Sequence, residues 1–83
     1  MADLTRMTAV EVPVLWEQRS QIFTQSQLDL SQTEAVDSAG IAFLVQWAKS
    51  LPQKQLTLLH APANVQALIK TFRLEPLFVL QAD

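Results

Sequence analysis

The sequence predicts one small α/β domain, spanning residues 1–83, with a mostly parallel sheet. Three observations indicate this fold class: a length of 83 residues, a hydrophobic fraction of 49%, and apolar residues that switch between a helical and a strand period. A chain of this length fits one domain with a single core. Strands that alternate with helices across short connections favour a layered arrangement with parallel strands.

The first half of the chain predicts a helix and then a strand. Residues 12–23 carry apolar side chains at near-helical spacing: Val12, Leu15, Trp16, Ile22 and Phe23. Pro13 is tolerated in the first helical turn, where its missing N–H costs nothing. Residues 26–30, "SQLDL", are short and alternating, which indicates a strand.

The second half repeats the alternation. A helix is expected over residues 38–51, with Pro52 at its end, and a strand over residues 55–60, "QLTLLH". Pro62 is expected to open a third helix and residues 77–80, "LFVL", to form a last strand. The apolar stripes of the two helices are Ile41, Leu44, Val45 and Ala48, and then Val65, Leu68, Ile69 and Phe72. Ahead of the first helix, only residues 2–6, "ADLTR", offer a strand.

Composition excludes several functions. A net charge of −2 gives no basic surface for nucleic acid. The absence of cysteine removes disulfides and thiol chemistry and is typical of a reducing cytoplasm. His60 is the only histidine, so no histidine pair can hold a metal. The N-terminus lacks the apolar region of a secretory signal, and the longest apolar run, "IAFLV", is far below the about 20 residues of a transmembrane helix.

The segment "EAVDSAGIAFLVQW" joins a polar tip to an apolar helix at Asp37, Ser38 and Gly40. In open α/β sheets, ligands and partners bind beyond the carboxyl ends of the strands, where helix N-termini expose N–H groups. A serine there is a natural place to bind or add a phosphate. Gly40, the only glycine, lets another backbone approach closely.

This segment resembles the central signature of the STAS domain (sulfate transporter and anti-sigma antagonist). In that family, a strand ending in Asp-Leu-Ser leads to Asp-Ser-Gly or Asp-Thr-Gly at the head of a helix. Asp29, Leu30 and Ser31 match the first motif, and Asp37, Ser38 and Gly40 match the second, with Ala39 as a departure. Residues 12–19, "VPVLWEQR", look like the first helix of the MlaB branch, and the resemblance covers roughly residues 2–80.

The resemblance implies a non-enzymatic cytoplasmic subunit without a cofactor. It would bind and regulate the ATPase of a phospholipid-transporting ABC complex that maintains outer-membrane lipid asymmetry, and reach the membrane only through that partner. The alternative is an anti-sigma factor antagonist that is switched by phosphorylation of Ser38. The expected partner-binding or phospho-switch residues are Asp37, Ser38, Ala39, Gly40, Phe43 and Trp47, with Ser31, Thr33 and Glu34 in the loop beside them.

Simpler roles stay open for the same residues. Asp37 and Ser38 are good helix caps. Phe43 and Trp47 lie four residues apart and either pack on an adjacent helix or form an exposed aromatic patch. A hydrolase would need a base beside Ser38, and no nucleophile elbow surrounds it. The carboxylates of Asp29, Glu34 and Asp37 are expected in a solvated loop rather than in a cation site, and Trp16 is expected in the core.

The family's usual first strand has no counterpart here, which indicates a mis-assigned start or a trimmed chain. An unpaired sheet edge would then act as a template for another strand. We therefore expect self-association, such as a homodimer, through that edge.

Overall fold

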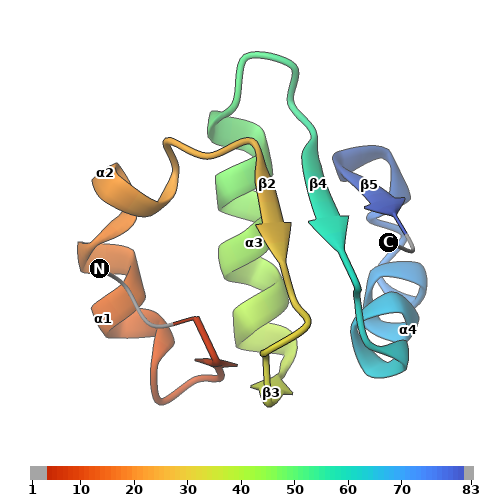
Figure 1. Ribbon diagram of the computed structural model, residues 1–83, viewed down its shortest axis with the longest axis horizontal. Helices are drawn as coiled ribbons and strands as arrows, with labels where there is room; N and C mark the ends of the chain where they lie inside the picture. Colours follow the sequence, from red (N-terminus) through yellow and green to blue (C-terminus); the bar gives the residue numbers. More distant parts are fainter. Residues whose placement is uncertain (1–3, 82–83) are drawn as a thin grey trace.

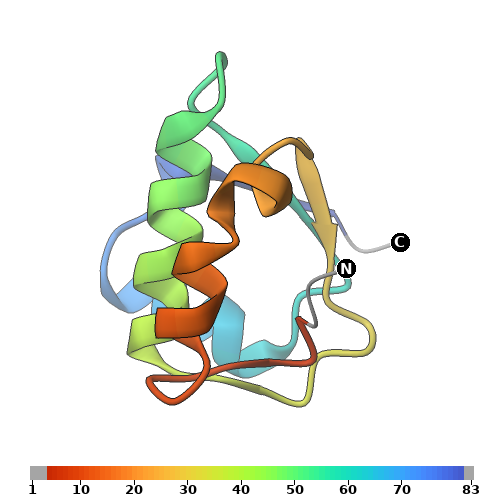
Figure 2. The same ribbon diagram turned by 90° about the vertical axis from the view of Figure 1, so that its left-hand side faces the viewer.

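The computed structural model describes residues 4–81. Helices lie on one side and the strands of the larger sheet on the other (Figures 1 and 2). Along the chain the elements are β1 Arg6–Met7, α1 Val12–Glu17, α2 Arg19–Ile22, β2 Gln27–Asp29, β3 Ala35–Val36, α3 Ser38–Ser50, β4 Leu56–Leu59, α4 Ala63–Thr71, a 3₁₀ turn at Glu75–Leu77, and β5 Phe78–Gln81. The predicted α/β class with parallel strands is confirmed.

The described strands form two separate parallel ladders. One joins β1 to β3, and the other has the order β2-β4-β5. In the larger ladder Leu28 pairs with Leu58, and Leu56 pairs with Phe78, and all four side chains are buried. The alternate positions, such as Gln27 and Val79, point to solvent. Helices therefore cover only one face of this sheet, which explains how so few elements form a complete core.

Helix α3 lies at the centre of the core. Its buried face packs against the inward side chains of the strands and the apolar stripes of the neighbouring helices. The largest fully buried side chains are Trp47, Met7, Leu30, Ile41, Leu44, Leu56, Leu58, Ile69 and Val65. No side-chain nitrogen or oxygen atom is buried without a hydrogen-bond partner among the described residues. The packing of α3 in the core thus fixes where its N-terminus points.

The sequence predicts one continuous helix over residues 12–23, and this prediction is wrong because the helix is interrupted at Gln18. Gln18 leaves the helical region with φ −96° and ψ 8°, and its N–H is shared between the carbonyls of Val14 and Leu15. Arg19 Nη1 donates to the carbonyl of Trp16 over 2.8 Å. Trp16 is 39% exposed, so the prediction that it belongs to the core is also wrong.

The N-terminal segment contains the short strand β1, which begins at the end of the predicted segment 2–6. Residues 1–3 lie outside the described residues. β1 pairs with β3, a strand that the sequence did not predict because two residues are too few to show a period. The later elements are confirmed within one or two residues at each end. Phe72, however, is 50% exposed and does not join the buried stripe of α4.

Candidate functional site: the head and outer face of helix α3

Asp37 caps helix α3. Its backbone is extended, and its Oδ1 accepts a hydrogen bond from the N–H of Gly40 over 3.0 Å. A side-chain oxygen at this position satisfies one of the free N–H groups of the first turn. The capping role that the sequence left open for Asp37 is therefore confirmed. Ser38 is the first helical residue, and Ala39, the second, is partly buried beside the same turn.

Gly40 places the first turn of α3 directly against the backbone of β1. A Cβ atom built on Gly40 would lie 2.0 Å from the carbonyl oxygen of Met7 and 2.9 Å from a methyl carbon of Val36. The same carbonyl of Met7 accepts a hydrogen bond from the N–H of Asp37 over 3.3 Å. The prediction that Gly40 allows another backbone to approach closely is confirmed, and that backbone is β1.

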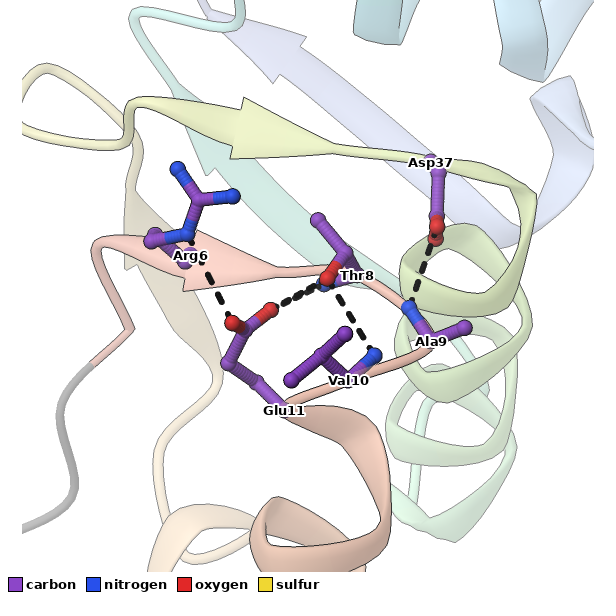
Figure 3. A network of polar contacts seen from close by, with 6 residues as sticks. All are labelled: Arg6, Thr8, Ala9, Val10, Glu11 and Asp37. Carbon is purple, nitrogen blue, oxygen red and sulfur yellow. Dashed lines mark hydrogen bonds and ion pairs between the residues drawn. The ribbon is translucent and has the colours of Figure 1, made fainter.

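Asp37 also binds the loop that follows β1. Its Oδ2 accepts a hydrogen bond from the N–H of Ala9 over 3.0 Å, so one carboxylate joins this loop to the head of α3 (Figure 3). The backbone N–H of Ala9 and then that of Gly40 are the main causes that lower the pKa of Asp37 below its ordinary value. Asp37 is consequently ionised at neutral pH and its two oxygens have different structural tasks.

Hydrogen bonds between Thr8 and Glu11 hold the same loop in shape (Figure 3). Glu11 Oε1 accepts hydrogen bonds from the N–H of Thr8 over 3.0 Å and from the Thr8 hydroxyl, while Thr8 Oγ1 accepts from the N–H of Val10 over 3.3 Å. These bonds lower the pKa of Glu11, and Arg6 Nε lies 3.5 Å from its other oxygen. Sequence reasoning missed these contacts, although a Thr and a Glu three residues apart ahead of an apolar run are a pattern that favours them.

The loop ends in an exposed apolar residue close to the head of α3. Val10 is 80% exposed and adjoins Ala9, whose N–H is bound by Asp37. Asp37 and the bonds between Thr8 and Glu11 together hold the loop that carries Val10 beside the first turn of α3. The N-terminal loop is thus part of the site, which the sequence did not indicate.

Ser38 is exposed, and its hydroxyl has no hydrogen-bond partner among residues 4–81. An apolar groove of about 290 Å³ lies beside it, between the outer face of α3 and the segment that follows α4. Its lining consists of Ser38, Ile41, Ala42, Val45, Gln46, Phe72 and Leu74. We call this the Ser38 groove. The helix cap does not use the Ser38 hydroxyl, which leaves that hydroxyl free to meet a partner.

The exposed aromatic patch predicted for Phe43 and Trp47 is wrong. Their side chains are 2% and 1% exposed, and they pack against Phe23 with ring centroids 5.5 and 5.7 Å away. Trp47 Nε1 donates to the carbonyl of Gln25 over 2.8 Å, which satisfies the indole in the core. The packing alternative holds instead, because α2 and the turn after it cover this side of α3. These two buried residues support helix α3 from the core and cannot contact a partner.

The loop residues Ser31, Thr33 and Glu34 organise the backbone. The N–H of Ser31 donates to Asp29 Oδ1 over 2.9 Å, and the N–H of Glu34 donates to the carbonyl of Thr5. Thr33 Oγ1 donates to the carbonyl of Leu4 over 3.3 Å. Thr33 and Glu34 thereby hold the N-terminal segment alongside β3, and within residues 4–81 no hydrogen bond or ion pair joins them to Ser38.

His60 pairs with Asp29 and not with Ser38. Its Nδ1 lies 3.0 Å from Asp29 Oδ1, at the carboxyl ends of β4 and β2. The N–H of Ser31 and the His60 ring hold the pKa of Asp29 below its ordinary value. In the described part of the chain, no three histidines or carboxylates gather where they could hold a metal ion. The polar groups near the strand ends therefore form hydrogen bonds with one another.

Comparison with known proteins supports the family. A family profile described as "Mlab, STAS domain" matches residues 3–81. Searches of curated proteins and of solved structures each gave no match. Within residues 4–81, no helix combines the length and apolarity needed to cross a membrane. Because the profile covers nearly the whole chain and the parallel α/β fold agrees with it, this chain belongs to the STAS domain family of the MlaB type.

Proposed function

We propose that this domain is a non-enzymatic regulatory subunit that docks on the ATPase of a phospholipid-transporting ABC complex. Docking would use Ser38 together with the Ser38 groove. The domain would stay in the cytoplasm and meet the inner membrane only through its partner. The observation that carries this proposal is the free, exposed Ser38 hydroxyl beside an apolar groove, in a chain of the MlaB type.

The groove has the composition of a protein interface. Phe72 supplies an aromatic wall that is half exposed, and the remaining lining is almost wholly aliphatic around one serine and one glutamine. Burying such a surface against a partner is favourable by about 25 cal/mol for each Å² of apolar area. A single exposed hydroxyl at the edge of the groove can then fix the position of the partner with one hydrogen bond worth about 0.5–1.5 kcal/mol.

Regulation by this surface needs no chemistry. A domain that binds one conformation of the ATPase better than another shifts the populations by that difference in affinity. The only histidine is paired with Asp29, and both carboxylate oxygens of the neighbouring Asp37 accept backbone hydrogen bonds, so neither residue is paired with Ser38 as a base. The surroundings of Ser38 therefore favour docking over catalysis.

Phosphorylation of Ser38 in an anti-sigma antagonist is the second candidate. The exposure of Ser38 on the first turn of α3 favours it, because a kinase can reach the hydroxyl. A phosphate added inside a docked interface would disrupt it through charge and desolvation. A kinase-like anti-sigma factor that phosphorylates Ser38, and is released by that step, would support this role.

The docking surface can be tested with two matched truncations. Phe72→Ala should raise the Kd for the purified ATPase subunit about 10-fold, because it removes an aromatic anchor. Val79→Ala is the control: Val79 is also an exposed apolar residue, but it lies on the uncovered face of the sheet. An unchanged affinity for Phe72→Ala, or an equal loss for both variants, would contradict the proposal.

A further inference from the structure

A second hollow lies beside helix α3, across its outer face from the Ser38 groove. It has a volume of about 530 Å³ and separates the second half of α3 from α1 and α2. Trp16 and Phe23 provide aromatic walls, in edge contact at 6.2 Å, and Arg19, Lys49 and Gln46 provide polar lining. We call it the Arg19 hollow. It shares Gln46 with the Ser38 groove, so both depressions flank the same ridge of α3.

The Arg19 guanidinium is held in a fixed position. Its central carbon lies 4.3 Å from the centre of the Trp16 ring, and Nη1 donates to the Trp16 carbonyl. This cation–π contact with one hydrogen bond leaves the other N–H groups of the guanidinium open to a carboxylate. A preorganised arginine loses less side-chain entropy when it binds a carboxylate than a free one would.

Among the described residues, the cations at the hollow have no carboxylate partner. Among residues 4–81 the ion pairs are those of Arg6 with Glu11 and of Asp29 with His60, so neither Arg19 nor Lys49 is neutralised. Lys54 adds a third cation at this end, where its Nζ donates to the Lys49 carbonyl over 2.8 Å. Glu17 is the one carboxylate within residues 4–81 that lines the hollow. A chain of net charge −2 thus concentrates positive charge at one place.

A helix C-terminus attracts cations, and this accounts for Lys49 and Lys54. The Arg19 guanidinium likewise bonds the last turn of α1 through the Trp16 carbonyl, but a helix C-terminus does not account for its stacking on an indole that is 39% exposed. An anionic membrane is also a poor fit, because lipid-binding clusters hold about 4–8 cations. A hollow with aromatic walls and two unpaired cations instead complements a protein segment that carries a carboxylate next to an apolar side chain.

We propose that the Arg19 hollow binds an acidic segment of the ATPase, in which a carboxylate pairs with Arg19 and Lys49 while a neighbouring apolar side chain contacts Trp16. This inference rests on the proposed docking function and names the chemistry of its second contact. It predicts an affinity that falls with salt concentration, because part of the interface is ionic.

The test is a set of titrations against the purified ATPase subunit of the cognate transporter. Arg19→Gln and Lys49→Gln should each raise the Kd about 10-fold, and Arg19→Glu should raise it about 100-fold because repulsion replaces attraction. Lys70→Glu on α4 changes the net charge as much as Arg19→Glu and should alter the Kd by less than about twofold. The Arg19→Gln variant should also show a weaker salt dependence than the parent.

The outcomes separate the two proposals. If the Arg19 and Lys49 variants bind like the parent while Phe72→Ala still weakens binding, the acidic-segment inference is wrong and the docking function stands. If the parent chain does not bind the ATPase, both are wrong. If Arg19→Glu leaves ATPase affinity unchanged but abolishes co-sedimentation with phosphatidylglycerol vesicles, the cations face a membrane and the inference is overturned.

Discussion

Gly40→Ala tests how closely helix α3 is packed against β1. The added Cβ would lie 2.0 Å from the Met7 carbonyl oxygen, while real Cβ atoms stay beyond 3.0 Å, and that neighbour is backbone that cannot rotate away. Separating the two elements would also weaken the hydrogen bond from Asp37 N to Met7 O. Overpacking costs about 1–3 kcal/mol, and a lost hydrogen bond about 1 kcal/mol.

The opposing effect is smaller. Alanine is favoured over glycine in a helix by about 1 kcal/mol. The balance is a loss of about 2 kcal/mol in the free energy of unfolding, which lowers the Tm of a domain of this size by about 8–16 °C.

Thermal unfolding followed by circular dichroism measures the effect. Ala42→Gly, on the exposed face of the same helix, calibrates the propensity term and should cost about 1 kcal/mol with no steric part. A Gly40→Ala variant that melts at or above the parent temperature would refute the close packing.

Three further predictions concern the loop, its carboxylate and the sheet edge. The pKa of Asp37 is lowered, so the stability that its carboxylate contributes is present at neutral pH and is lost as the pH falls through that pKa. Between about pH 5 and pH 3, the Tm of the parent should therefore fall by more than the Tm of Asp37→Asn. An equal fall in Tm for both proteins would argue against the contact to Ala9. Glu11→Ala should lower the free energy of unfolding in urea titrations, because it removes the hydrogen bonds that Glu11 accepts from Thr8, while Glu17→Ala is the control and should leave it unchanged. In the described chain β2 pairs only with β4, so its other edge is open to a second strand. Sedimentation velocity should therefore show self-association that rises with protein concentration, and Gln27→Pro should reduce it. A monomer at every concentration would contradict pairing through this edge.

The long periodic segments explain why most of the fold was predictable. Helix α3 and the strands around it carry clear periods and are bounded by Pro52 and Pro62, so their type and place follow from local pattern. The exposure of Trp16 and Phe72 could not be predicted, since a helical stripe does not show how far a neighbouring element extends over it. Strand β3 is too short to show any period.

The site was predictable at its centre and not at its borders. The cap at Asp37 follows from a local motif because capping depends on nearby residues, and the single glycine indicates a close approach at Gly40 without showing that β1 is the partner. The clamp from Asp37 to Ala9 joins residues 28 positions apart, which no local pattern encodes. Phe43 and Trp47 were misplaced because a four-residue spacing fits a buried pair as well as an exposed one, and only the position of Phe23 decides between them.

Binding of Ser38 variants to the purified ATPase subunit tests the docking claim most directly. Ser38→Glu should leave the Tm within a few degrees of the parent or slightly higher, because a carboxylate in the first helical turn stabilises α3 by about 0.3–1 kcal/mol. The same carboxylate must lose its water inside the interface, so the Kd should rise well above that of Ser38→Ala, which removes one hydrogen bond worth about 0.5–1.5 kcal/mol. Stability and affinity are thus predicted to separate. A Ser38→Glu variant that binds the ATPase like the parent, or one that melts early, would contradict the account.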